Sequence, residues 1–141
     1  MPAGRQLQRT EVVTAFLRHD GKVLLLRRSG RVGSYQGRWA GVSGYLEDPA
    51  PLQQALREIR EETGLQDNHV RLVSAGTPLE VPAPELGKLW VVHPFLFDVT
   101  GAEAIRLDWE NTEARWVLPE EVAALPGVPA LAEALATVLG S

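Results

Sequence analysis

Three glutamates within five residues constrain this chain more than any other feature: Glu58, Glu61 and Glu62. An α-helix advances about 100° per residue, so these side chains fall within roughly 100° of arc on one side of a helix. Like charges at spacings of three and four residues destabilise an isolated helix by a few tenths of a kcal/mol per pair. A bound cation would offset this repulsion, and a hard divalent metal prefers oxygen ligands. The sequence therefore predicts a helix that carries a metal site.

The predicted helix begins near Pro51 and ends at Gly64. Proline suits the first helical turn because its missing N–H would have no partner there, and glycine suits the left-handed position that follows a helix. A separate apolar arc is expected to face a core. This arc consists of Leu52, Ala55, Leu56 and Ile59.

The part of the chain before this helix predicts a β-hairpin and a long loop. Residues 11–18 and 22–28 are rich in strand-forming side chains and flank an Asp20-Gly21 turn, which is typical of a hairpin. Residues 29–44 contain five glycines and little periodicity. They predict either a long functional loop or a loop with short strands.

The part after the helix predicts more strands and two helical segments, so the chain belongs to the α/β class. The expected strands, at 70–75, 89–99 and 114–117, come with a proline-containing surface loop at 77–87 and a helix start at Pro119. Pro94 implies a bulge or an edge position in its strand. A helix over 129–139 is expected to direct Leu131, Leu135, Val138 and Leu139 inward.

Composition bounds the function further. A chain of 141 residues with 45% hydrophobic residues fits one domain over 1–141, with residues 1–10 as a flexible arm or edge segment. The net charge of −4 disfavours an extended nucleic-acid surface, although a metal can still bridge the protein to an anionic small molecule. Cysteine is absent, which excludes disulfides and thiolate chemistry. Without a signal-like or membrane-spanning apolar run, we expect a cytoplasmic protein.

The helix and its flanks resemble the Nudix box, Gly-x5-Glu-x7-Arg-Glu-U-x-Glu-Glu-x-Gly-U, in which U is aliphatic. The second half matches in full, through Arg57, Glu58, Ile59, Glu61, Glu62, Gly64 and Leu65. The likeness extends over roughly residues 12–139, including Gly37-Arg38-Trp39 and Trp116-Val117. It implies a single Nudix domain: an α/β/α sandwich with a mixed central sheet, the glutamate helix on one face and the C-terminal helix on the other.

The first half of the box departs from the family pattern. Counting back from Arg57, the family's glutamate falls on Pro49 and its glycine on Ser43. A one-residue deletion in the loop lets Gly44 serve as the box glycine. The acids left to replace the missing glutamate are Glu47 and Asp48. In the family that glutamate mainly supports the loop and the arginine, so the departure concerns loop geometry more than activity.

The resemblance implies hydrolysis of a diphosphate linkage in a nucleoside-diphosphate-linked or nucleoside polyphosphate substrate, with Mg²⁺ or Mn²⁺ as cofactor. Glu58 and Glu62 are expected to bind the metal directly, and Glu61 directly or through water. A backbone carbonyl at Ser43 or Gly44 is expected to complete the ligand set. These positions follow from the family motif and its shortened front half.

Catalysis also needs a group that activates water and a group that orients the carboxylates. The resemblance places the base at Glu110 or at one of the box glutamates, with Asp108 and Glu113 as alternatives to Glu110. Arg57 is expected to hold a carboxylate through its fork geometry rather than contact the substrate.

Substrate contacts are expected from basic and aromatic side chains. The candidates for phosphate are Arg27, Arg28, Arg38 and Lys88. The candidates for stacking on a base or lining its pocket are Trp39, Trp90, Tyr35 and Phe95, of which Trp90 and Phe95 better fit the core of a strand. The expected partner is a small nucleotide, and many relatives pair as homodimers. The sequence leaves open nucleotide sugars, ADP-ribose, dinucleoside polyphosphates and nucleoside triphosphates, because such contacts come from variable loops.

Two other functions are compatible with the same scaffold. The altered front of the box supports a nucleotide-binding or regulatory module with weak or no catalysis. An isopentenyl-diphosphate isomerase is the other, but that chemistry usually calls on a reactive cysteine, which this chain lacks. Metal-dependent release of product from a diphosphate compound separates the enzyme from the binding module.

Overall fold

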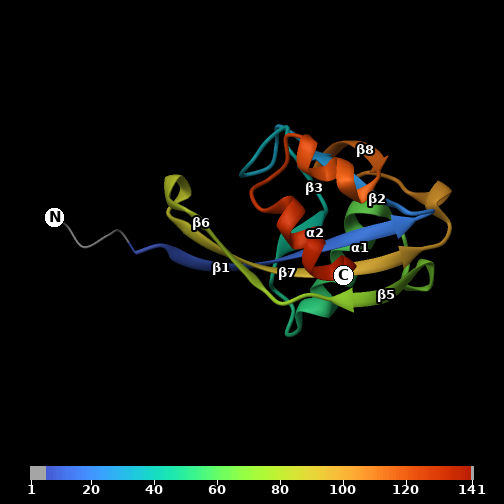
Figure 1. The fold of residues 1–141 in the computed structure, drawn as a ribbon, viewed down its shortest axis with the longest axis horizontal. Coiled ribbons are helices and arrows are strands. Elements are labelled where there is room, and N and C mark those ends of the chain that lie inside the picture. Colours follow the sequence, from blue (N-terminus) through green and yellow to red (C-terminus); the bar gives the residue numbers. More distant parts are fainter. Residues whose placement is uncertain (1–5, 141) are drawn as a thin grey trace.

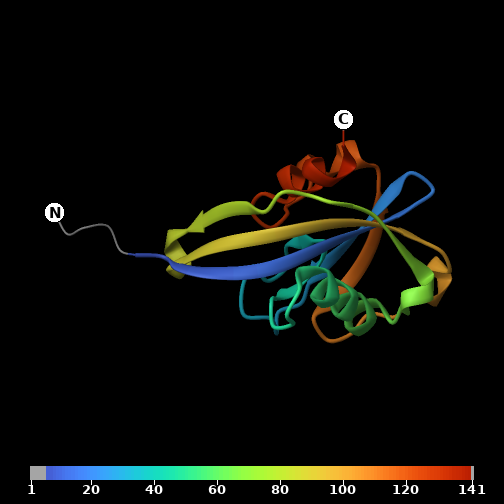
Figure 2. The same ribbon diagram turned by 90° about the horizontal axis from the view of Figure 1, so that it is seen from below.

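The computed structural model describes residues 6–140 and contains a mixed sheet with α-helices on both of its faces. Figures 1 and 2 show α1 (Pro51–Thr63) on one side of this sheet and α2 (Leu131–Leu139) on the other. The strands are β1 (Gln8–His19), β2 (Lys22–Arg28), β3 (Trp39–Ala40), β4 (Val42–Tyr45), β5 (Val70–Ala75), β6 (Leu79–Ala83), β7 (Lys88–Val99) and β8 (Asn111–Val117). The predicted α/β fold with a mixed central sheet is confirmed.

The sheet is built around one long parallel pair. β1 and β7 run side by side from Gln8 opposite Lys88 to Arg18 opposite Asp98. The other side of β1 pairs antiparallel first with β4 and then with β2, whereas the other side of β7 pairs with β6 and β5. β2 in turn pairs with β3 and β8. The central pair therefore connects all the strands into one body.

Two cores lie on opposite faces of this sheet because neighbouring strand residues point in opposite directions. On the α1 side, Leu17 and Phe97 pack in a cluster with Ile59 of the helix. On the α2 side, Phe16 and Leu96 pack with Leu135. The alternation along β1 and β7 thus fixes both helices to the sheet.

α1 has the bounds that the sequence predicts. Gly64 follows it with φ 79°, and its N–H donates to the carbonyl of Arg60 at 3.0 Å. Ala55 and Ile59 are buried, as expected for the apolar arc. Leu52 is 37% exposed, so the prediction that it faces the core is wrong; it lies in the first turn, where the helix extends past the sheet-facing cluster.

Three other expectations are corrected by the sheet. Residues 77–87 are not simply a loop, because they contain β6, which pairs with β7, and a 3-10 helix at Pro84–Leu86. Of the two positions expected for Pro94, a bulge or an edge, the edge is wrong, because Pro94 lies in β7 where its pairing changes from β5 to β6. The Pro94 carbonyl accepts a hydrogen bond from the N–H of Gly76. Leu139 at the end of α2 is exposed rather than inward.

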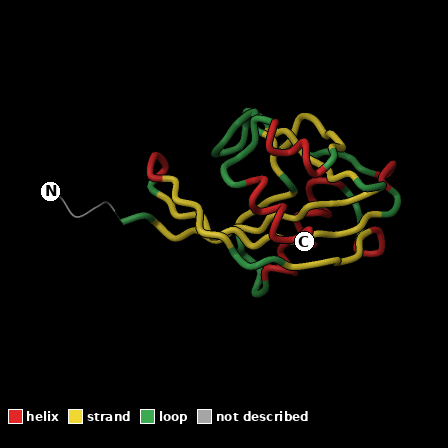
Figure 3. The backbone as a smooth tube through the Cα atoms, in the orientation of Figure 1, coloured by secondary structure: helices red, strands yellow, loops and turns green. Residues whose placement is uncertain are grey.

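The start of β1 belongs to an extension of the sheet that Figure 3 shows reaching away from α1 and α2. Residues 8–10 pair with β7 on one side, and β4 begins to pair with β1 only at Val12. Residues 1–5 of the predicted arm lie outside the described residues. No helix within residues 6–140 is long and apolar enough to cross a membrane.

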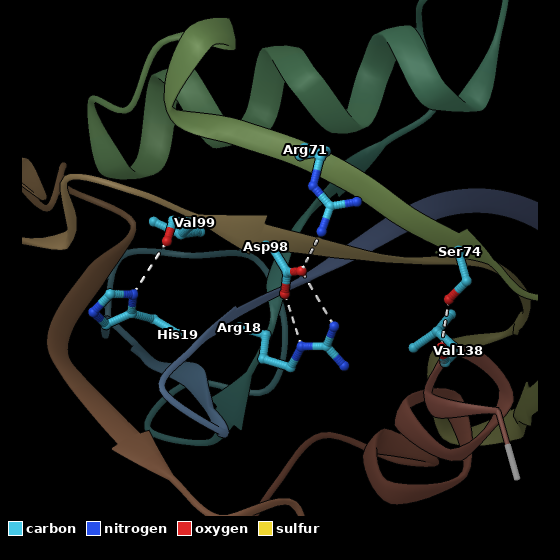
Figure 4. A network of polar contacts seen from close by, with 7 residues as sticks. All are labelled: Arg18, His19, Arg71, Ser74, Asp98, Val99 and Val138. Carbon is cyan, nitrogen blue, oxygen red and sulfur yellow. Dashed lines mark hydrogen bonds and ion pairs between the residues drawn. The ribbon is translucent and has the colours of Figure 1, made fainter.

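Polar contacts connect strand ends away from the glutamates (Figure 4). Asp98 accepts hydrogen bonds from Arg18 at 2.8 Å and from Arg71 at 2.7 Å. The Arg18 hydrogen bond is the main reason that the pKa of Asp98 lies below its ordinary value. Ser74 donates to the carbonyl of Val138, which connects β5 to α2.

Candidate active site

A cavity of about 430 Å³ lies beside the N-terminal strands and α1, and its wall has two chemically distinct parts. One part is acidic and includes Glu58, Glu61 and Glu110. The other part is aliphatic and aromatic and includes Val12, Tyr35, Tyr45, Leu79, Val81, Trp90 and Val92. Ligand cavities combine apolar walls with a few polar groups, and here the acidic part would attract a cation while the apolar part suits an uncharged, flat group.

Three carboxylates meet at the acidic end. Glu58, Glu62 and Glu110 each place one oxygen within 4.8 Å of the other two. Glu58 and Glu62 come from one face of α1 and are 8% and 3% exposed, whereas Glu110 comes from the loop before β8. The sequence predicts Glu61 as the third member. The structure instead brings in Glu110 and leaves Glu61 on the cavity wall, where its carboxylate lies 3.4 Å from Arg57.

One oxygen of this cluster has no hydrogen-bond partner among the described residues. Glu62 accepts a hydrogen bond from Asn111 through Oε1 at 3.0 Å, but its Oε2 is buried and unpaired. Buried polar atoms are almost always hydrogen-bonded, so an orphan oxygen needs an explanation. Burial raises the pKa of Glu62 well above its ordinary value, and the nearby charge of Glu110 raises it further. A divalent cation would satisfy the oxygen and neutralise the repulsion, so the residues present fit a metal.

The pKa values of the other two carboxylates, Glu58 and Glu110, are raised as well. Burial raises the pKa of Glu58, although hydrogen bonds oppose the shift. Burial raises the pKa of Glu110 to about 7, and the charges of Asp108 and Glu58 add to the effect. Arg28 lines the same cavity and opposes the rise in Glu110, while burial lowers the pKa of Arg28 itself. The site therefore concentrates negative charge beside one half-buried cation.

The backbone of β4 passes directly over the Glu58 carboxylate at Gly44. A Cβ atom built at Gly44 would lie 2.7 Å from Glu58 Oε1 and closer still to the carboxyl carbon and Oε2. Real Cβ atoms do not make such contacts, so any other residue at this position would require the Glu58 carboxylate to move. Ser43, the predicted source of a carbonyl ligand, also lines the cavity, and its hydroxyl pairs with Thr14 at 3.1 Å.

Arg57 does not itself line the cavity, but its guanidinium lies among carboxylates. Its guanidinium is 3.4 Å from Asp48 and 3.9 Å from Glu47, the two acids expected to replace the missing box glutamate. Its pKa is raised above the ordinary value, chiefly by Glu61 and then by Asp48. The arginine thus faces the loop and the exposed side of the helix.

Sequence reasoning did not single out Gln54, although it is completely buried beside Glu58. Its Nε2 donates to Glu58 Oε2 at 2.8 Å, and its Oε1 accepts from the backbone N–H groups of Glu47 and Asp48 at 2.7 and 2.8 Å. The available signal was spacing: Gln54 lies four residues before Glu58 and therefore on the same helix face.

Among the predicted substrate contacts, Arg28, Tyr35 and Trp90 line the cavity and the others do not. Trp39 is 5% exposed and packs in the core beneath α2, because β3 pairs with β2 and directs its ring inward. Arg27 and Arg38 are exposed, and Arg27 lies 3.8 Å from Glu113. None of these three lines the cavity. Lys88 lies beside it, with Nζ 4.8 Å from the ring centre of Trp90.

Tyr45 and Trp109 also line the cavity beside the predicted Tyr35 and Trp90, although the sequence analysis did not single them out. The Trp90 indole N–H donates to the Tyr35 hydroxyl at 2.9 Å, and the Tyr45 ring lies 6.2 Å from that of Trp90. Trp109 is exposed at the same cavity, next in sequence to Glu110. Tyr35 and Trp109 lie in loops, where no helical or strand periodicity indicates which way a side chain points.

Comparison with known proteins identifies the family. The family model described as the NUDIX domain matches residues 7–138. The chain therefore belongs to the Nudix family, and it is an enzyme of the pyrophosphohydrolase type that acts on diphosphate linkages. It is 31% identical to the CTP pyrophosphohydrolase of Escherichia coli (strain K12) over 121 residues, which cover 85% of this chain and 84% of that relative.

Other relatives either cover a smaller part of the chain or are less identical to it in sequence. The RNA pyrophosphohydrolase of Xanthomonas campestris pv. campestris (strain B100) is 38% identical over 68 residues, which cover 48% of this chain and 31% of that relative. Among solved structures, the MutT protein from Methanosarcina mazei Go1 has a TM-score of 0.75 at 24% identity, covering 89% of this chain and 88% of that chain. The E. coli ORF135 protein has a TM-score of 0.68 at 26% identity, covering 96% and 93%.

Proposed function

We propose that this enzyme hydrolyses a nucleoside triphosphate or a related nucleoside-diphosphate-linked compound and uses Mg²⁺ or Mn²⁺ to do so. The observation that carries the proposal is the buried, unpaired Oε2 of Glu62 within a cluster of three carboxylates. Such a cluster is costly without a cation, and two of its members, Glu58 and Glu110, line a cavity large enough for a nucleotide.

Glu58 and Glu62 would hold the metal, because both project from the rigid face of α1 and are buried. Glu61, on the adjacent wall, and a backbone carbonyl at Ser43 or Gly44 remain proposed as additional ligands, directly or through water. When bound, the ion polarises the phosphoryl group and neutralises charge on the leaving phosphate.

Glu110 is proposed as the group that accepts the proton of the attacking water. Its carboxylate faces the two helix glutamates from a different segment, and its pKa of about 7 suits a general base near neutral pH. Arg28 is positioned to face substrate phosphate, since it is the half-buried guanidinium on the cavity wall. Arg57 would maintain the arrangement of acids beside the helix rather than contact the substrate.

The aromatic end of the cavity supports a nucleobase as the other end of the substrate. Tyr45 and Trp90 offer ring faces and Tyr35 a hydroxyl group, which together suit a flat polar heterocycle. The similarity to a CTP pyrophosphohydrolase places nucleoside triphosphates, and CTP among them, first on the substrate panel. The expected products are a nucleoside monophosphate and pyrophosphate.

The proposal is tested with Glu58→Gln, which removes a charged ligand but keeps the hydrogen-bonding shape of the side chain. Glu133→Gln is the matched control, because Glu133 is an exposed residue of α2. We expect Glu58→Gln to lose at least about 100-fold in turnover with Mg²⁺, with an unchanged or higher urea midpoint, while Glu133→Gln behaves like wild type.

Full activity of Glu58→Gln, or of wild-type enzyme in EDTA, contradicts the proposal. A wild-type protein that binds nucleotides but releases no product from any panel compound, with either Mg²⁺ or Mn²⁺, is instead a binding module.

A further inference from the structure

We infer that Gln54 is a positioning residue for the metal site and performs the structural task that the shortened box motif leaves without its glutamate. One amide group connects the loop before α1 to the Glu58 carboxylate. The inference rests on the proposed function, because it assigns a role toward the metal that Glu58 would hold.

The chemistry of the amide fixes its orientation. Two consecutive backbone N–H groups, those of Glu47 and Asp48, point to one end of the Gln54 side chain, so that end must be the carbonyl oxygen. The NH₂ group then necessarily faces Glu58 Oε2, which accepts its hydrogen bond at 2.8 Å. A carboxylate held through one oxygen keeps its second oxygen available for a cation.

Burial makes this connection stiff. The Gln54 side chain is fully buried, so none of its three hydrogen bonds competes with water. An i,i+4 pair on one helix keeps the amide and the carboxylate in a fixed relation. The backbone of Gly44 also lies against the Glu58 carboxylate, so the amide and the β4 backbone together limit where the carboxylate can move.

The contacts also explain how the loop tolerates Pro49 at the position of the family's glutamate. The Arg57 guanidinium pairs with Asp48 at 3.4 Å, but this pair is partly exposed. The buried contact to the loop comes from Gln54, which binds the backbone rather than a side chain. The loop therefore depends on residue 54 more than on the identity of its acids.

The decisive experiment compares Gln54→Met, which keeps the side-chain length but loses all three hydrogen bonds, with Gln53→Met at the adjacent exposed position. For Gln54→Met we expect Mn²⁺ affinity, measured without substrate, to fall about 10- to 100-fold. We expect kcat to fall by a similar factor, while the KM for nucleotide changes less than about twofold. In the metal-free protein, the Glu47 and Asp48 amides should exchange hydrogen faster.

Gln54→Glu provides a second variant that keeps oxygen acceptors for both loop amides but offers Glu58 no donor when ionised. We expect slow amide exchange as in wild type, together with a lower kcat. Gln53→Met should match wild type in every measurement.

Wild-type Mn²⁺ affinity and kcat in Gln54→Met overturn the inference, and so does faster loop exchange without any loss of metal affinity, which would mean that Gln54 supports the loop only. A wild-type enzyme that neither binds Mn²⁺ nor hydrolyses a nucleotide overturns the proposed function as well. The two failures are therefore distinguished by the wild-type measurement.

Discussion

Gly44→Ala is the sharpest test of the site geometry, because it adds one methyl group where the β4 backbone meets Glu58. The added Cβ would lie 2.7 Å from Glu58 Oε1 and closer to two other carboxyl atoms. Carbon and oxygen atoms need separations of about 3.4 Å or more, so the carboxylate must retreat by about 1 Å. Its retreat is opposed by the hydrogen bond from buried Gln54.

The magnitude follows from that displacement. A shift of about 1 Å in a catalytic group costs about 100-fold in rate, which corresponds to about 2.7 kcal/mol in kcat/KM. The effect on folding should be smaller, about 1 kcal/mol, because the strand pairing of Gly44 with Val13 and the helix hydrogen bonds remain. The φ angle of Gly44 lies outside the left-handed region, so alanine adds no backbone strain.

The assay measures kcat/KM for nucleotide hydrolysis, Mn²⁺ affinity and the urea midpoint in parallel. Gly33→Ala is the matched control, since Gly33 lines the same cavity but a Cβ there meets nothing within 4 Å. We expect a large loss of activity and metal affinity in Gly44→Ala alone. Activity within twofold of wild type in a folded Gly44→Ala enzyme would refute the close approach of β4 to Glu58.

Two further predictions concern stability. The pKa of Glu110 is about 7 in the folded protein against an ordinary 4.5, and the pKa of Glu62 is also raised, so the folded state binds more protons than the unfolded state. The unfolding free energy of the metal-free enzyme should therefore fall from pH 5 to pH 8. After allowance for the partial exposure of Glu110, the expected fall is about 1–2 kcal/mol. Urea midpoints in EDTA measure this fall, which Mg²⁺ should reduce, and a flat profile would contradict it. Asp98→Asn should lower the free energy of unfolding by about 0.5–1 kcal/mol at pH 7, because the ion pair of Asp98 with Arg18 is partly exposed. It should leave kcat/KM unchanged, because this pair lies outside the cavity lining. The pKa of Asp98 is lowered in the folded protein, so the stabilisation by the ion pair is present above pH 4 and is lost as the pH falls through the folded pKa. The unfolding free energies of variant and wild type should therefore converge in acid. A difference that stays constant with pH would count against the ion pair.

Local chemistry made several elements predictable. α1 has the expected bounds because Pro51 and Gly64 act through their own backbone preferences. The first hairpin turns at Asp20 and Gly21, both with positive φ, as an Asp-Gly sequence favours. β6 escaped prediction because the three prolines of residues 77–87 suggested a loop, yet Pro82 is compatible with a strand that has a neighbour on only one side.

The sequence by itself determined that Glu58 and Glu62 share a helix face and that the chain resembles a Nudix enzyme, because helical periodicity relates residues close in the chain. Only the tertiary structure decided what lies opposite that face. It brought Glu110 in from a distant loop, left Glu61 with Arg57, and set Gly44 and Gln54 against Glu58. Within residues 6–140 it also left one oxygen of Glu62 without a hydrogen-bond partner. Contacts across the fold depend on how β4 and the loop before β8 pack against α1, and no local periodicity encodes that packing.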